Sequence, residues 1–291
     1  LPEIDMAKAD LHIHTYYSDG QSSPTDIVEK AGEMGYTTLA ITDHDGVSGI
    51  EEAVGAGTRN GIQVIPGIEL DTETEDGTDL HILGYGMDLE NPEFRRAVNE
   101  LERRRQRRNE GLLRALADLG YPLSLEELKK RQPGRYVGKP VIARAMAEKG
   151  YIDNYKEAFS PGRFLESSQA KAVKKEPFSS TGAISLIRKA GGTPVLAHPI
   201  QIKGMGTPGS EEFYRAVEKL VASLVENGLA GMECYHPDQN QEQSQRFVRM
   251  ARRYELWITR GSDFHGTDYG QEKEWILGNP FQACGKQGLR M

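Results

Sequence analysis

The chain has 291 residues, 37% of them hydrophobic and 27% charged, a composition typical of a folded globular protein. Its formal net charge of −7 argues against attraction of the whole surface to long nucleic acid. Two cysteines, Cys234 and Cys284, exclude a disulfide scaffold and favour a reducing cytoplasm. We expect no membrane span, because no apolar run reaches about 18 residues, and no signal peptide at the N-terminus.

The first 90 residues alternate strand signals with helix signals. The predicted strands are 11–14, 37–42, 62–65 and 80–85, and the predicted helices are 24–34 and 50–60. Ser23 is placed to cap the first of these helices, and Pro24 fits its first position. Short apolar strands separated by helices predict a parallel sheet that is covered on both faces.

The alternation stops between residues 91 and 176. This segment reads as a long amphipathic helix from Phe94 to Leu119, followed by shorter helices at 125–131 and 140–149, with no convincing strand. We interpret residues 91–176 as a helical insertion subdomain.

The strand and helix signals return after the insertion. Strands are predicted at 193–198, 231–235 and 256–259, and helices at 181–189, 211–227 and 241–254. Thr181 is a plausible cap for the first of these helices. With about seven strand–helix units, the chain is predicted to be an α/β protein in which residues 6–90 and 177–291 form one barrel.

A short polar pattern lies in the first predicted strand, Asp10-Leu11-His12-Ile13-His14. Side chains alternate along a strand, so Asp10, His12 and His14 share one face. Two neutral imidazoles beside a carboxylate suit a first-row divalent metal. Taken alone, this pair of histidines fits a chance placement equally well.

Similar side chains recur where other predicted strands end, which is where parallel α/β barrels gather functional groups. The full set of candidate metal ligands is His12, His14, Asp19, His44, Glu69, His81, His198, Asp263 and His265. His81 lies within or just after a strand, and six of the seven histidines of the chain belong to the set. No cysteine joins it, which favours a hydrolytic site over a structural zinc site.

Nine candidate ligands exceed what one metal ion needs, since first-row ions take about four to six. We therefore expect two or three divalent ions. Glu69 is the best bridging candidate because of its central place in the series. A hydroxide held between two such metals can attack phosphorus, and the metals neutralise the developing charge.

These motifs occur together and in order. D-L-H-I-H-T, S-D-G, I-T-D-H-D, P-G-I-E, H-I-L-G-Y, L-A-H-P and G-S-D-F-H resemble those of the PHP (polymerase and histidinol phosphatase) family, and the resemblance covers residues 8–266. It implies a distorted (β/α)7 barrel with a trinuclear centre of manganese, iron or zinc. It also implies three ligand sets: His12, His14, Glu69 and Asp263; Glu69, His81 and His198; and Asp19, His44 and His265.

The substrate-facing positions depart from those of similar nucleotide-cleaving proteins. Such proteins tend to read G-R-P-H in the insertion, where this chain reads Gly138-Lys139-Pro140-Val141. They tend to read H-P-G-R-Y after the sixth strand, where this chain continues from His198 to Lys203 without an arginine. The metal ligands are therefore kept while the groups that select the substrate differ.

Four residues are candidates for contact with a substrate phosphate: Lys139, Arg144, Lys203 and His236. Arginine and lysine neutralise phosphate oxygens, although each cation also fits a solvated surface position. His236 is in addition a candidate general acid, since imidazole titrates near neutrality. Together with Asp263 it forms the predicted catalytic pair.

Five arginines between Arg103 and Arg108 lie in the middle of the long helix. Pairing with nearby glutamates at helical spacing makes a solvated face the simpler interpretation. The alternative is a guide for an anionic substrate, with steep salt dependence.

The sequence thus predicts a metal-dependent phosphoesterase that acts on a nucleotide or a phosphorylated small molecule, cyclic phosphates included. Two alternatives stay open: an exonuclease on short oligonucleotides, and a non-catalytic, metal-stabilised scaffold module. Long nucleic acid and membranes are not expected partners. The oligomeric state is not predicted.

Overall fold

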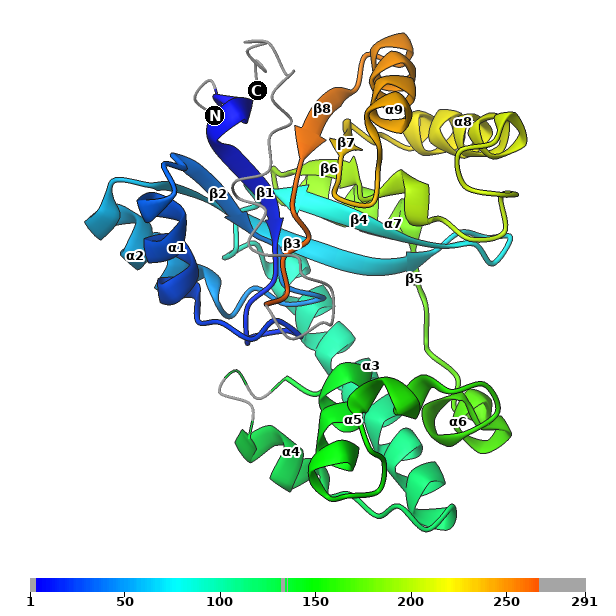
Figure 1. Cartoon of the computed structure of the whole chain (residues 1–291). Coiled ribbons are helices and arrows are strands. Elements are labelled where there is room, and N and C mark those ends of the chain that lie inside the picture. The colour runs from blue at the N-terminus through cyan, green and yellow to red at the C-terminus, as the bar shows by residue number, and fades with distance from the viewer. Residues whose placement is uncertain (1–3, 132–133, 135, 267–291) are drawn as a thin grey trace.

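The structure is a computed structural model that describes residues 4–131, 134 and 136–266 (Figure 1). Cys284 and the end of the second predicted barrel segment lie outside the described residues. Among the described helices, none is both long and apolar enough to cross a bilayer.

The centre of the fold is a curled sheet in which seven strands follow the order β1-β2-β3-β4-β6-β7-β8. Their bounds are β1 Ala9–Ile13, β2 Thr38–Ile41, β3 Gln63–Glu73, β4 Asp79–Tyr85, β6 Thr193–Leu196, β7 Gly231–Tyr235 and β8 Trp257–Arg260. The short β5, Phe178–Ser179, pairs with β3 outside this path. A bridge between Ile13 and Phe264 brings the two ends of the sheet together. The predicted distorted barrel is thereby confirmed.

The prediction that every strand is parallel is wrong for β4. This strand runs antiparallel to both β3 and β6, because it returns from β3 through a tight hairpin turn at residues 74–78. The reversal explains the position of His81. Near the start of a reversed strand, His81 lies at the same rim of the barrel as the carboxyl ends of the parallel strands.

The third strand is longer than predicted. β3 continues through Pro66 and Gly67 to Glu73, so Glu69 lies inside the strand rather than after its end. Pairing with β2 stops at Pro66, and the rest of β3 pairs with β4. Close packing at this point requires Gly67, because a Cβ atom there would meet the carbonyl oxygen of Ile41.

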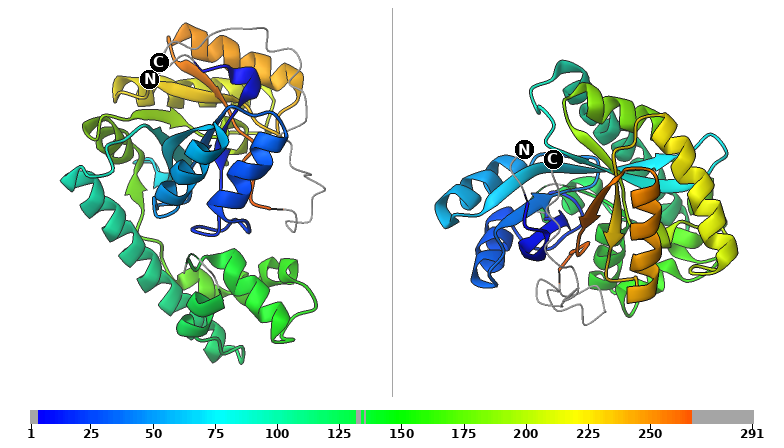
Figure 2. Two further views of the ribbon diagram at one scale, coloured as in Figure 1. Left: turned by 90° about the vertical axis from the view of Figure 1, so that its left-hand side faces the viewer. Right: turned by 90° about the horizontal axis from the view of Figure 1, so that it is seen from above.

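Five helices lie outside the sheet (Figure 2): α1 Pro24–Glu33, α2 Ile50–Asn60, α7 Ser180–Lys189, α8 Glu211–Glu226 and α9 Gln241–Arg253. Ser23 caps α1 and Pro24 begins it, as predicted. The cap of α7 is Ser179 rather than Thr181, since the Ser179 hydroxyl accepts the Gly182 amide N–H. Buried side chains such as Ile82, Phe213 and Phe247 fill the space between helices and sheet.

The segment between β4 and β5 is helical, and no described residue from 91 to 176 lies in a strand. It contains α3 Pro92–Asp118, α4 Leu125–Arg131, α5 Lys139–Glu148 and α6 Ser168–Ala172. Leu116, Ile142 and Met146 belong to a separate hydrophobic cluster. Phe94 and Leu101, near the start of α3, instead pack into the barrel core. The division of the chain at residues 91 and 176 stays a prediction.

Gly261, just after β8, allows this end of the sheet to approach β1. A Cβ atom there would overlap the Cβ of His12 and a carboxylate oxygen of Glu233.

We expect Gly261→Ala to lower the free energy of unfolding by about 1–3 kcal/mol, the usual cost of overpacking, as measured by urea denaturation. Gly55→Ala is the matched control. It lies in α2 with no close neighbour and should be neutral or stabilising. Equal stability of the two variants would contradict the close approach.

Candidate metal centre

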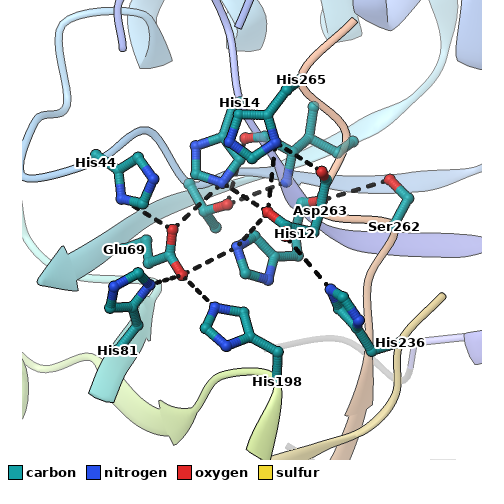
Figure 3. Close-up of polar contacts among 12 residues, drawn as sticks. His12, His14, His44, Glu69, His81, His198, His236, Ser262, Asp263 and His265 are labelled. Carbon is teal, nitrogen blue, oxygen red and sulfur yellow. Dashed lines mark hydrogen bonds and ion pairs between the residues drawn. The ribbon is translucent and has the colours of Figure 1, made fainter. Parts of the chain in front are cut away.

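All nine candidate ligands meet at one rim of the barrel (Figure 3 labels eight of them). They come from β1 and the loop after it, from the ends of β2, β6 and β8, and from within β3 and β4. Their ligand atoms form four overlapping groups, each with all atoms within 4.8 Å of one another. The groups are His14, Asp19, His44 and His265; His12, Glu69 and His198; His12, His14 and Asp263; and His44, Glu69 and His81.

Glu69 lies in the middle of the cluster and is 1% exposed. Its Oε1 lies 2.8 Å from Nδ1 of His81 and 3.0 Å from Nε2 of His198. Its Oε2 lies 3.0 Å from Nδ1 of His44. Burial alone would raise the pKa of this carboxyl, but the histidines around it, His44 first, hold the pKa well below its usual range.

Two further carboxylates complete the cluster. Oδ1 of Asp263 lies 3.1 Å from Nε2 of His14, and Oδ1 of Asp19 lies 3.3 Å from Nε2 of His265. Asp263 and His198 have positive φ angles of 52° and 21°, a backbone region that non-glycine residues rarely adopt and that collects at functional sites. The two ligand candidates therefore share an uncommon backbone conformation, which Asp45, Phe164 and Glu255 also adopt.

Several buried atoms in the cluster are suited to bind a cation. Nε2 of His12, Nε2 of His14 and Oε2 of Glu69 are buried. Each lies within 3.3 Å of an oppositely charged or polar atom, but none of these contacts has the geometry of a hydrogen bond, although buried polar atoms are normally satisfied. Burial disfavours a charged His14, yet Asp263 and Glu69 raise its pKa to about 10. The carboxylates therefore attract positive charge to this point. An imidazole and carboxylate donor set of this kind suits divalent first-row metals.

Glu233, which lies in β7 and is fully buried, was not predicted from the sequence as a site residue. The Nδ1 of His12 lies 3.1 Å from Oε1 of Glu233, and the backbone N–H of His198 donates to Oε2 at 2.8 Å. A proton on Nδ1 of His12 then leaves Nε2 free for a metal, which is the usual role of a carboxylate behind a ligating histidine. A glutamate between Met232 and Cys234 in an otherwise apolar strand was the available signal.

Two buried aspartates support the ligand-bearing loops in a similar way. Asp43 accepts hydrogen bonds from the backbone N–H and the hydroxyl of Thr15 at 2.8 and 2.7 Å, and also from Ser18. It thereby holds the loop that carries Asp19. Asp10 accepts the backbone N–H of Ser262 at 2.9 Å, which ties the segment before Asp263 to β1.

A cavity of about 210 Å³ adjoins the cluster and is named the central cavity here. Its wall includes His44 and His81, the cations Arg104, Arg105, Arg108, Lys139 and Lys175, and the carboxylates Asp19, Asp45, Asp71 and Glu176. Among the predicted phosphate contacts, Lys139 lines this cavity, and its Nζ lies 3.8 Å from Glu166. Arg144 and the exposed Lys203 are not among the residues that line this cavity, so their roles stay predictions.

His236 is fully buried beside the cluster. The backbone N–H of Asp238 donates to its Nδ1 at 3.1 Å. The ring proton of neutral His236 then belongs on Nε2, which lies 3.4 Å from Oδ2 of Asp263 (Figure 3). In this orientation Nε2–H donates a hydrogen bond toward the metal cluster.

The arginine run divides between two environments. Arg103 is 73% exposed at the side chain, as the solvated interpretation predicts. Arg105 departs from that interpretation with 11% exposure: it lies 3.4 Å from Asp45 and stacks on the ring of Tyr136 at 4.6 Å. Arg105 thus connects the insertion to the loop that follows His44.

Together, the barrel, the buried nitrogen and oxygen ligands and the adjoining cationic cavity define a metal-dependent hydrolase. The comparisons agree: residues 10–230 match the PHP domain, and the chain belongs to the PHP domain family. It is 33% identical to a 5'-3' exoribonuclease of Haemophilus influenzae, over 89% of this chain and 90% of the relative. It is 30% identical to the phosphoribosyl 1,2-cyclic phosphate 1,2-diphosphodiesterase of Eggerthella lenta, over 88% and 94%.

A solved structure from Bifidobacterium adolescentis, described as a metal-dependent phosphoesterase, superimposes with a TM-score of 0.76. Its identity to this chain is 27%, and the match covers 90% of both chains. The chain is thus a divalent-metal-dependent phosphoesterase.

Removal of the Glu233 charge tests whether this carboxylate orients the ligand candidates His12 and His198. We expect Glu233→Gln to lower metal affinity by about 10- to 100-fold, because His12 and His198 lose their shared anionic acceptor. Titration of the metal-free protein with Mn²⁺, followed by calorimetry, measures the effect. Glu226→Gln, at the exposed end of α8, should bind Mn²⁺ like the wild type. Unchanged affinity in Glu233→Gln would show that Glu233 does not orient the ligands.

Proposed function

We propose that the chain hydrolyses a phosphate mono- or diester of a nucleotide or a phosphorylated small molecule, cyclic phosphates included. The observation that carries the proposal is the buried ligand cluster, with unsatisfied atoms on His12, His14 and Glu69, beside a cation-lined cavity. Relatives of this family include a named cyclic phosphate diphosphodiesterase. The cysteine content favours action in a reducing cytoplasm.

Two or three ions of manganese, iron or zinc are the proposed cofactors. His12, His14, Glu69 and Asp263 would hold one ion, while Glu69, His81 and His198 would hold a second. Asp19, His44 and His265 would hold a third. Contacts of Glu69 with His81 and His198 at 2.8 and 3.0 Å, and of Asp19 with His265 at 3.3 Å, support this grouping. When bound, such ions activate water and neutralise phosphate charge.

Residues of the chain itself then bind and orient the ester. Lys139 is proposed to attract phosphate oxygens from the wall of the central cavity, helped by the neighbouring Lys175. His236 is proposed to act as general acid in its imidazolium form and to give the Nε2 proton to the leaving oxygen. In that form Nδ1 also carries a proton, and the Asp238 carboxylate, 4.0 Å away, is its nearby acceptor in place of the contact with the Asp238 backbone N–H. Asp263 accepts the Nε2–H of His236 at 3.4 Å and so keeps the ring turned toward the cluster.

A second candidate function is exonucleolytic trimming of short oligonucleotides. It is favoured by the 33% identity to an exoribonuclease and by Arg104 and Arg108 in the wall of the central cavity. A scaffold role without catalysis is not favoured, since the relatives that align with most of this chain are named as hydrolases.

The function is tested by elemental analysis and a substrate panel. We expect at least two divalent ions per chain and phosphate or nucleotide release from one class among nucleotides, cyclic phosphates, sugar phosphates and short oligonucleotides. A chelator should abolish release, and Mn²⁺, Fe²⁺ or Zn²⁺ should restore it. Fewer than two ions, with no release from any class, would sink the proposal.

The role of His236 is tested with leaving groups of different basicity. We expect His236→Gln to lower kcat for an alkoxide leaving group by about 10²- to 10⁴-fold. The loss should be much smaller for p-nitrophenyl phosphate, whose leaving group needs little protonation. Metal content is measured in the same samples. Unchanged turnover of both substrates with the metals still bound would remove His236 from the mechanism.

A further inference from the structure

A second cavity lined by cations adjoins the central cavity and lies along α3. It has a volume of about 510 Å³ and lies between α3 and the segment 169–176. We name it the arginine groove, and its cations are Arg104, Arg107, Arg108, Arg114 and Lys174. Among the described residues, two carboxylates, Asp118 and Glu176, share its wall. Local charge there is positive although the whole chain is acidic.

The groove and the central cavity meet at Arg104, Arg108 and Glu176, which line both. From there the groove follows one face of α3 toward Arg114. Ten residues of α-helix span about 15 Å, so the groove leads well beyond a single bound phosphate. An anionic chain that starts at the metal cluster would therefore pass Arg108 beside the paired Arg104 and Glu176, and would then reach Arg114 and Lys174.

The cations of the groove differ in how far they are neutralised. Arg107 lies 3.1 Å from Glu100 and 3.0 Å from Glu176, and Arg104 contacts the same two glutamates. Within the described part of the chain, no carboxylate pairs with Arg108, Arg114 or Lys174. The Nε atom of Arg108 is buried and has no hydrogen-bond partner. A buried guanidinium donor of this kind calls for an acceptor.

We propose that the arginine groove binds the phosphates that follow the scissile ester in a single-stranded oligonucleotide. Arg108 takes the first of these phosphates, and Arg114 and Lys174 take later ones. Arginine and lysine neutralise backbone phosphates without reading the base, so the groove selects for chain length rather than for sequence. This inference rests on the proposed phosphoesterase function and assigns the polyanionic class of its substrate.

The kinetic test uses the metal-loaded protein and oligoribonucleotides of two to six residues, with p-nitrophenyl phosphate as the small ester. We expect KM to fall as the oligonucleotide grows, and to rise steeply with salt. In the double variant Arg114→Ala and Lys174→Ala, kcat/KM for the hexamer relative to the small ester should fall about tenfold. The slope of log KM against log salt should be smaller by about 0.7 for each phosphate that the variant no longer neutralises.

Arg96→Ala is the matched control, since Arg96 is an exposed arginine of the same helix that lies outside the groove. It should keep the wild-type ratio. The proposed role of the groove would be contradicted if KM did not depend on oligonucleotide length and if all variants had the same kcat/KM for the hexamer relative to the small ester. Turnover of the small ester in that case would still support the phosphoesterase function.

A binding measurement keeps the two proposals separate. Fluorescence anisotropy with a labelled, phosphorothioate-linked hexamer reports on the groove even if no ester is hydrolysed. Weaker binding by the double variant than by Arg96→Ala would support the groove. Equal binding by both would overturn it. Absence of turnover with every substrate would instead count against the proposed function alone.

Discussion

The burial of one carboxylate, that of Glu69, is the constraint on which the site depends. A buried anion is unfavourable unless nearby groups compensate it. Five histidines, His12, His14, His44, His81 and His198, lie within 3.3 Å of its oxygens. They come from four different strands or their ends, so the carboxylate can be compensated only if the sheet curls. Compensation of the buried Glu69 carboxylate therefore depends on closure of the barrel.

The reversal of β4 shows how the fold meets this requirement. In a purely parallel barrel, a residue near the start of a strand would face the opposite rim. The hairpin between β3 and β4 turns His81 toward the other ligands, and its Nε2 lies 2.9 Å from Asp71 of the neighbouring strand. The sequence predicted the strand and the ligand, because both are local patterns. The direction of β4 was not predictable from local patterns, because its pairing with β6 is a contact between segments that are distant in the chain.

The same distinction separates the predicted site residues from the missed ones. The nine ligand candidates stand in short motifs, and their grouping at strand ends was visible in the sequence. Glu233 was missed because its partners, His12 and His198, are distant in the chain. Arg105 was taken for a solvated residue because helical spacing offers it glutamates. Its actual partners, Asp45 and Tyr136, are brought to it only by the placement of the insertion.

The insertion is tied to the very segments that carry metal ligands. Arg105 contacts Asp45, one residue after His44, and Lys175 lies 2.7 Å from Asp71, which in turn contacts His81. Each tie neutralises a largely buried carboxylate, so separation of the insertion from the barrel would leave charges near the ligands uncompensated. The cations that face the substrate are therefore placed by the same contacts that fix the rim. A change in the insertion can then alter which phosphate ester is bound while the metal ligands stay the same.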